Sequence, residues 1–267
     1  MMPDSDVREV GSRFETGAVS HVGKVRSQNE DSYLVSTKAG VWAVADGMGG
    51  HDAGDLASRT VVKELACIIA PTSAAQLLAD CEARLVSANN RLQSIARQRG
   101  GTVIGTTVAA LLVFEKFFAC VWSGDSRIYR IRGFAIEQIS IDHTEAQQLV
   151  AEGRLTTAEA QTWPHRNVIT RAIGARDRPE IEMISGILEP QDIFIICSDG
   201  LTGHVNDLEI LALASYNPPQ RACDLLVSLT LERGATDNVT VIAVRIGPPS
   251  AAQVAMQTGD TWGAASE

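Results

Sequence analysis

Four aspartates stand where apolar, strand-like segments of the sequence begin or end. They are Asp46 closing VWAVAD, Asp125 after FFACVWSG, Asp199 closing IFIICSD, and Asp237 before NVTVIAV. An ionised carboxylate at the rim of an apolar core is costly unless it is paired or binds a metal ion. A single such residue is explained as well by a turn, because Asp beside Gly is common in turns. Four in the same setting favour a shared site.

The charges near these aspartates favour a divalent cation as their partner. Apart from Arg127, few Lys or Arg residues lie near the strand ends in the sequence. Clustered carboxylate oxygens are ligands that hard cations prefer. No His or Cys spacing typical of zinc sites is present. The sequence therefore predicts a site for Mg²⁺ or Mn²⁺.

The segment GKVRSQNEDSYLV adds an arginine and an acidic pair, Glu30 and Asp31, upstream of Asp46. Arg26 lies four residues before Glu30, and its planar guanidinium suits two-point binding of a phosphate group. A solvated turn with a local ion pair explains these residues equally well.

The loop GMGGH follows Asp46 and ends at His51. A glycine at position 47 lets the backbone approach a metal ion where a side chain would obstruct it. An ordinary flexible turn is the alternative. Because Asp46 and His51 flank the glycines, we favour the site interpretation.

Strands and helices of two kinds must position these residues. Strand-like patterns cover residues 17–23, 32–37, 41–46, 106–114, 117–132, 192–199 and 238–246. After the candidate caps Thr72 and Ser73, a helical stripe runs through Leu78, Cys81, Leu85, Ala88, Leu92 and Ile95 to Gly100 and Gly101. Further helices are predicted over residues 54–70 and 219–233. Two adjacent helices between blocks of strands favour an α+β fold in which helices cover largely antiparallel sheets.

Composition excludes several classes of protein. The chain has 267 residues, 45% of them hydrophobic, which allows one large domain with a sizeable core. A net charge of -9 without a long basic cluster argues against nucleic-acid or anionic-membrane binding.

Five scattered cysteines predict reduced, mostly buried thiols. No secretory signal or membrane-spanning run is visible, so we expect a cytoplasmic location. Residues 1–14 and the tail 247–267 are expected to be flexible.

The motifs together resemble a known family, the metal-dependent protein Ser/Thr phosphatases of the PP2C (PPM) type in their bacterial form. The matching pieces are VRSQNEDS, ADGMGGHDAG, GTTVAALL, WSGDSRIYR, IDHT, HRNVITRAIG, CSDGL and TDNVTVI. They occur in the family's order and cover roughly residues 17–246. The resemblance implies a phosphatase domain over residues 15–246. It also implies a four-layer α-β-β-α sandwich of two antiparallel sheets flanked by helix pairs.

The resemblance also implies a role for each site residue. Asp46 corresponds to the carboxylate that bridges two Mn²⁺ or Mg²⁺ ions, Gly47 to a backbone carbonyl ligand of the second metal, and Glu30 to that metal's acidic residue. Asp199 and Asp237 correspond to ligands of the first metal, and Asp125 to the residue that holds a third, weaker metal with Asp199. Arg26 matches the arginine that binds the substrate phosphate, and His51 matches a proposed general acid. Asp142 to Gly174 resembles the flap beside the active site, although a simple surface helical hairpin explains that segment too.

The implied reaction is hydrolysis of phosphoserine and phosphothreonine by direct attack of a water or hydroxide that bridges the metals. The implied partners are phosphorylated proteins and an opposing bacterial Ser/Thr kinase, and we expect a monomer.

No cysteine has an arginine six positions later, and no phosphate-binding P-loop occurs, which argues against cysteine phosphatases and NTPases. Two alternatives stay open: a catalytically silent binding module, which the intact Asp46, Asp199 and Asp237 disfavour, and hydrolysis of small phosphoesters only.

Overall fold

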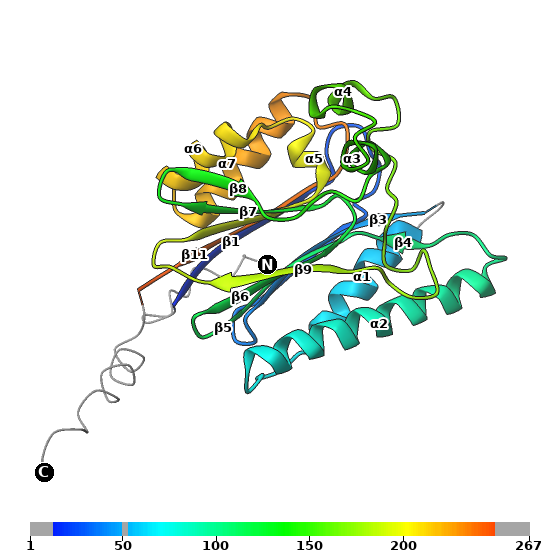
Figure 1. The fold of residues 1–267 in the computed structure, drawn as a ribbon, viewed down its shortest axis with the longest axis horizontal. Helices are drawn as coiled ribbons and strands as arrows, with labels where there is room; N and C mark the ends of the chain where they lie inside the picture. The colour runs from blue at the N-terminus through cyan, green and yellow to red at the C-terminus, as the bar shows by residue number, and fades with distance from the viewer. Residues whose placement is uncertain (1–12, 50–52, 249–267) are drawn as a thin grey trace, which may run out of the picture.

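The structure is a computed structural model that describes residues 13–49 and 53–248. Two antiparallel sheets pack face to face, and helices cover both outer faces (Figure 1). The first sheet has the strand order β1 (Phe14–His21), β11 (Val239–Ile246), β10 (Ile193–Cys197), β7 (Arg127–Arg132) and β8 (Ala135–Gln138). The second has the order β2 (Asp31–Ser36), β3 (Val41–Met48), β5 (Val108–Phe114), β6 (Phe117–Ser123) and β9 (Glu182–Ile187), with β4 (Gly105–Thr106) paired to the end of β3.

Helices form the two outer layers. The second sheet is covered by α1 (Ala53–Leu65) and α2 (Ala74–Gln98), whereas α5 (Asp199–Thr202), α6 (Asp207–Tyr216) and α7 (Pro219–Glu232) pack on the first. The short helices α3 (Glu145–Ala151) and α4 (Thr157–Thr162) lie beyond one end of the sandwich (Figure 1). The predicted four-layer α+β sandwich is confirmed.

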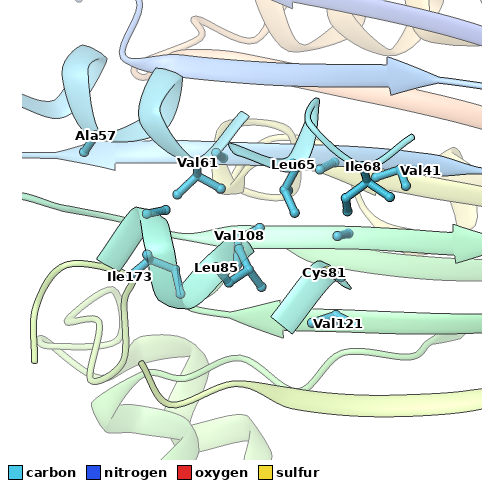
Figure 2. Packing of buried hydrophobic residues seen from close by; sticks show 14 of the residues in the cluster. Val41, Ala57, Val61, Leu65, Ile68, Cys81, Leu85, Val108, Val121 and Ile173 are labelled. Atoms are coloured by element: carbon cyan, nitrogen blue, oxygen red, sulfur yellow. The ribbon is translucent and has the colours of Figure 1, made fainter. Parts of the chain in front are cut away.

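Strand β3 shows how alternation builds these layers. Its side chains point to opposite faces in turn, as the period of a strand requires. Val41 and Ala43 pack beneath α1 and α2, while Trp42 and Val44 join the core between the sheets. Figure 2 shows the outer layer, where Val61 and Leu65 of α1 and Leu85 of α2 lie over the sheet. All five residues from Val41 to Ala45 are fully buried, so the strand is fixed on both faces before it reaches Asp46.

The long predicted helix is confirmed as α2, and the structure identifies its N-cap residue. Of the two candidate caps it is Ser73 whose side chain accepts a hydrogen bond from the Gln76 backbone N–H. Cys81, Leu85, Ala88 and Leu92 are buried as the spacing predicts. The preceding helix, expected over residues 54–70, ends earlier, at Leu65. Ala70 adopts a left-handed φ of 45° directly before Pro71, and a residue before proline disfavours the helical region.

The run at residues 117–132 reads as one strand in the sequence but forms two strands in different sheets. β6 belongs to the second sheet and β7 to the first. The chain crosses between them at Gly124, whose φ of 111° suits glycine. Asp125 therefore sits at the crossing, between the two sheets.

The thiols and helices agree with the composition. Cys81, Cys120, Cys197 and Cys223 are buried and unbridged, whereas Cys67 is exposed. Within the described residues, every helix is too short or too polar to cross a bilayer. The stretches 1–14 and 247–267, expected to be flexible, fall almost entirely outside the described residues, and their flexibility stays a prediction.

Candidate metal centre

Strand β3 carries Asp46 to the end of the second sheet. The backbone N–H of Asp46 donates to the Thr107 hydroxyl at 3.0 Å, and its carbonyl accepts from Thr107 N at 2.8 Å and the Thr106 hydroxyl at 2.9 Å. Asp31 stands directly opposite Asp46 in the β2–β3 pair. Burial, reinforced by the carboxylates of Asp31 and Asp199, raises the pKa of Asp46 well above its usual range. The chain thus holds this carboxyl rigidly in a place where its negative charge is unfavourable.

Asp199 reaches the same place from the first sheet. It opens α5, immediately after the buried strand β10. A side chain at Gly200 would meet the Asn238 carbonyl at 1.9 Å, so glycine allows α5 to lie against the start of β11. Burial and the nearby Asp237 raise the pKa of Asp199, while a hydrogen bond with Asp46 opposes that rise. Two carboxyls from two different sheets therefore lie within hydrogen-bonding reach of each other.

Asp237 forms an ion pair with Arg26, the residue predicted to bind the substrate phosphate. The Arg26 guanidinium donates to Asp237 Oδ2 at 2.7 Å, and Asp237 Oδ1 accepts from the Asn238 backbone N–H at 2.8 Å. Both side chains keep substantial exposure, 54% for Arg26 and 39% for Asp237. Arg26 thus forms an ion pair, but with the predicted metal ligand Asp237 and not with the nearby Glu30. Arg26 stands at the edge of the carboxylate cluster with its guanidinium open to solvent.

Glu30 and Gly47 present two oxygens to one point. A methyl group built on Gly54, in the first turn of α1, would lie 2.5 Å from Glu30 Oε1 and 2.8 Å from the Gly47 carbonyl oxygen. A side chain on Gly47 would itself meet the Gly54 carbonyl at 2.0 Å. Gly47 is therefore required where β3, the Glu30 loop and α1 come together. The Glu30 carboxylate and the Gly47 carbonyl thus both lie beside Gly54, and their role as ligands of one metal stays a prediction.

Asp125 is the most isolated of the carboxyls. Its side chain is only 6% exposed, and its Oδ1 has no hydrogen-bond partner among the described residues. Burial and the Asp199 carboxylate raise its pKa to about 8. The nearby Arg127 does not neutralise it, because that guanidinium forms a two-point pair with Asp142 at 2.7 and 3.0 Å. A buried carboxyl oxygen without a donor fits a position that a cation would complete.

The flap predicted from Asp142 to Gly174 contains α3 and α4 and is closed at its base. Thr144 pairs with Ile169 in an isolated bridge, and the Thr170 backbone N–H donates to the His143 carbonyl at 2.8 Å. Ile173 exchanges two backbone hydrogen bonds with Thr106 of β4. Because β4 also pairs with Gly47 and Met48, the base of the flap is bonded to the strand that carries Asp46.

Two residues outside the predicted set organise the centre. Asn238 is 5% exposed; its amide donates to the carbonyls of Val22 and Gln28 at 2.8 and 2.9 Å, and its Oδ1 accepts from Glu30 N at 2.8 Å. Asp31 accepts from the Ser198 hydroxyl at 2.8 Å, and its Oδ1 has no partner in the described part of the chain. Burial raises the pKa of Asp31 to about 7. The sequence signal for both was adjacency, since each directly follows a predicted ligand.

His51, the predicted general acid, lies outside the described residues together with its two neighbours, and its role stays a prediction. Within the residues that the structure describes, no three His, Cys, Asp or Glu side chains form a complete metal cage. Neighbouring carboxylates instead raise the pKa values of Asp46 and Asp199. Carboxylates held this way are suited to hard divalent cations, which remove the mutual repulsion. The donor set therefore fits Mg²⁺ or Mn²⁺.

Comparisons with known proteins show the family of the chain. The family model for protein phosphatase 2C matches residues 20–230. The Serine/threonine protein phosphatase PstP of Mycobacterium tuberculosis is 36% identical over 231 residues, which are 86% of this chain and 44% of PstP. The chain thus spans less than half the length of that curated relative.

Solved structures are similar over almost their whole length. PppA of Pseudomonas aeruginosa, described as a key regulatory component of T6SS, has a TM-score of 0.82 and 38% identity, covering 88% of this chain and 99% of that one. The catalytic domain of PstP in complex with two manganese ions has a TM-score of 0.80 and 33% identity, with the same coverage. The chain belongs to the protein phosphatase 2C family.

Proposed function

We propose that the chain is a metal-dependent protein Ser/Thr phosphatase that hydrolyses phosphoserine and phosphothreonine in proteins. The observation that carries the proposal is the approach of the Asp46 and Asp199 carboxyls from two sheets, with Asp237 near Asp199 and Arg26 hydrogen-bonded to Asp237 at 2.7 Å. This arrangement provides oxygen ligands for cations and, at their edge, a cationic group shaped to bind phosphate.

We assign the ligands as the family resemblance implies. Asp46 would hold both of two Mn²⁺ or Mg²⁺ ions, Asp199 and Asp237 would hold one, and Glu30 with the Gly47 carbonyl would hold the other. Bound cations of this kind acidify water and screen the charge of a phosphate dianion. Asp125 is assigned, together with Asp199, to a third cation.

Each chain residue then has a defined task. When a cation is bound, Asp237 would be one of the residues that hold it, and Arg26 would be available to bind and align the phosphoryl group. His51 is assigned to protonating the leaving oxygen of serine or threonine, a task that an ordinary imidazole pKa near 6.5 suits. The segment from Asp142 to Gly174 acts as a flap that contacts the residues around the phosphorylated side chain.

The test is turnover of a phosphothreonine peptide with Mn²⁺, with Mg²⁺ and with chelator. We expect turnover only with metal, and a loss of at least a hundredfold in Asp199→Asn. Asp224→Asn on the outer helix α7 is the matched control and should turn over normally. Metal-independent turnover, or an unimpaired Asp199→Asn variant, would overturn the proposal. Turnover of an aryl phosphate without turnover of the peptide would favour the small-phosphoester alternative.

Two further variants separate binding from proton transfer. Arg26→Ala should raise KM for the phosphopeptide much more than it lowers kcat, and Arg26→Lys should recover part of the loss because it restores charge without the planar geometry. His51→Ala should lower kcat and remove a limb from the pH–rate profile. An unchanged KM for the first variant, or an unchanged profile for the second, would contradict the assigned role.

We also propose that a bacterial Ser/Thr kinase supplies the phosphorylated substrates and that the protein acts as a cytoplasmic monomer. The similarity to PstP and PppA supports this assignment. A cell extract phosphorylated by the candidate kinase should lose phosphothreonine signal with the wild-type chain and keep it with Asp199→Asn.

A further inference from the structure

An apolar groove lies at the end of the second sheet that is farther from the proposed metal centre. We call it the β9 groove. It has a volume of about 390 Å³, and its walls include Leu78, Phe114, Phe117, Phe118, Gly186 and Ile187. They come from the first turns of α2, the β5–β6 turn and the end of β9. None of these side chains is charged, so the groove suits an apolar ligand.

Strand β9 leaves one of its edges unpaired. It pairs with β6 on one side and with no other strand among the described residues. Phe117 is 41% exposed and Ile187 is 58% exposed. Natural sheets usually protect such edges with charges, bulges or a covering segment. Within EMISGI of β9 the only charged residue is Glu182, and the Arg132 guanidinium donates to the Ile187 carbonyl at one end of the edge at 3.0 Å. The apolar surface beside it suits a covering segment.

The described chain ends next to this groove. The Ile246 carbonyl, at the end of β11, accepts from Gln191 N at 2.8 Å, and Gln191 belongs to the short connection that follows β9. Gly247 N donates to the Arg13 carbonyl at 2.7 Å, and the Arg13 guanidinium contacts the carbonyl of Glu115 in the β5–β6 turn. The chain therefore leaves β11 between the two turns that border the groove.

Residues 249–267 follow from this point, and fully extended they would reach about 60 Å. Small and polar residues dominate the segment, but it contains one large aromatic residue, Trp262. Asp260 precedes it by two positions, and Lys116 at the groove places its Nζ 5.6 Å from the centre of the Phe117 ring. A buried indole is a strong anchor because it removes a large apolar area from water.

We propose that residues 249–267 dock into the β9 groove of the same molecule, with Trp262 as the apolar anchor and Asp260 facing Lys116. The docked segment lies along the free edge of β9 and covers Phe117 and Ile187. The groove is thereby an intramolecular binding site for the carboxy-terminal segment, separate from the proposed catalytic centre.

The test uses the full chain labelled with 5-fluorotryptophan and followed by ¹⁹F NMR. The resonance that disappears in Trp262→Phe is assigned to Trp262. In the wild type we expect it to be shifted from its position in a free peptide of residues 249–267. Phe117→Glu should return it to the free-peptide position. The matched control is Phe134→Glu, a change at an 88% exposed site in the β7–β8 turn, which should leave the resonance in place.

A second measurement does not alter the folded core. Trp262→Ala should speed hydrogen exchange of the β9 backbone amides by tenfold or more while exchange in β8, an edge of the other sheet, stays constant. A free-peptide resonance in the wild type, or unchanged β9 exchange in Trp262→Ala, would overturn the proposal. A wild-type shift that disappears on dilution would also overturn it, since it would mean that the segment docks on a second copy.

Discussion

Replacing Asn238 by alanine should weaken both the fold and the metal centre. The Asn238 side chain makes three hydrogen bonds, all to backbone groups of the loop that carries Arg26 and Glu30. A typical protein hydrogen bond contributes about 1 kcal/mol net, and a buried group left without a partner costs somewhat more. We therefore expect Asn238→Ala to lower the free energy of unfolding by about 3 kcal/mol. Without these bonds the Glu30 backbone is free to shift.

The second effect should appear in metal affinity. Residues that orient metal ligands usually contribute about 10–100-fold to affinity. Because Asn238 accepts from Glu30 N, we expect Asn238→Ala to weaken Mn²⁺ binding by at least tenfold, measured by calorimetry well below the unfolding temperature. Urea denaturation without metal gives the stability term separately.

The chain contains a matched control in Asn89. This residue is fully buried, donates to the carbonyls of Arg176 and Asp177, and accepts from Gly174 N. Asn89→Ala removes the same number and kind of hydrogen bonds, far along the chain from Glu30. It should cost a similar free energy of unfolding and leave Mn²⁺ affinity unchanged. Equal losses of metal affinity in both variants, or a loss below about 1 kcal/mol in Asn238→Ala, would refute the reasoning.

Three further predictions concern single sites. Gly54→Ala should abolish binding of one of two Mn²⁺ ions in calorimetry, since its methyl group would crowd the oxygens near it at 2.5 and 2.8 Å. Gly133→Ala meets open space but has a left-handed φ of 60°, so it should lose stability and still bind both ions. Arg132→Ala should lower the free energy of unfolding in urea by about 2 kcal/mol, because it leaves the buried carboxylate of Asp192 without its two-point partner. The pKa of His143 is lowered by burial and by the neighbouring Arg171 guanidinium, so NMR titration should place its midpoint below 6.5. Because the unfolded chain binds this proton more tightly than the folded chain, the contribution of His143 to the free energy of unfolding should be constant above pH 6.5 and decrease as the pH falls below 6.5. A midpoint above 6.5 would contradict the last prediction.

Sequence patterns predicted the elements whose side chains alternate or repeat without interruption. In β3 the apolar run from Val41 to Ala45 required burial on both faces, and the strand is buried on both. In α2 the three-and-four spacing required one buried stripe, and Cys81, Leu85 and Leu92 form it. These patterns are local, so a window of the sequence contains the information.

Features that depend on contacts distant in sequence could not be predicted this way. The change of sheet at Gly124 follows from which strands pair, and the run around it is apolar on both sides. The importance of Asn238 depends on a loop more than 200 residues earlier. The site aspartates were accessible to prediction because each ends or begins a strand, whereas the pairing of Arg26 with Asp237 required the folded arrangement.

The division of the carboxylates between the two sheets has a consequence for the whole sandwich. Asp46 ends a strand of one sheet, while Asp199 and Asp237 flank strands of the other. Cations bound in the proposed arrangement would cross-link the two sheets at one end of the sandwich. A ligand that binds only the folded state at 100 times its dissociation constant stabilises that state by about 2.7 kcal/mol. Catalytic competence and resistance to heat would then depend on the same free metal concentration.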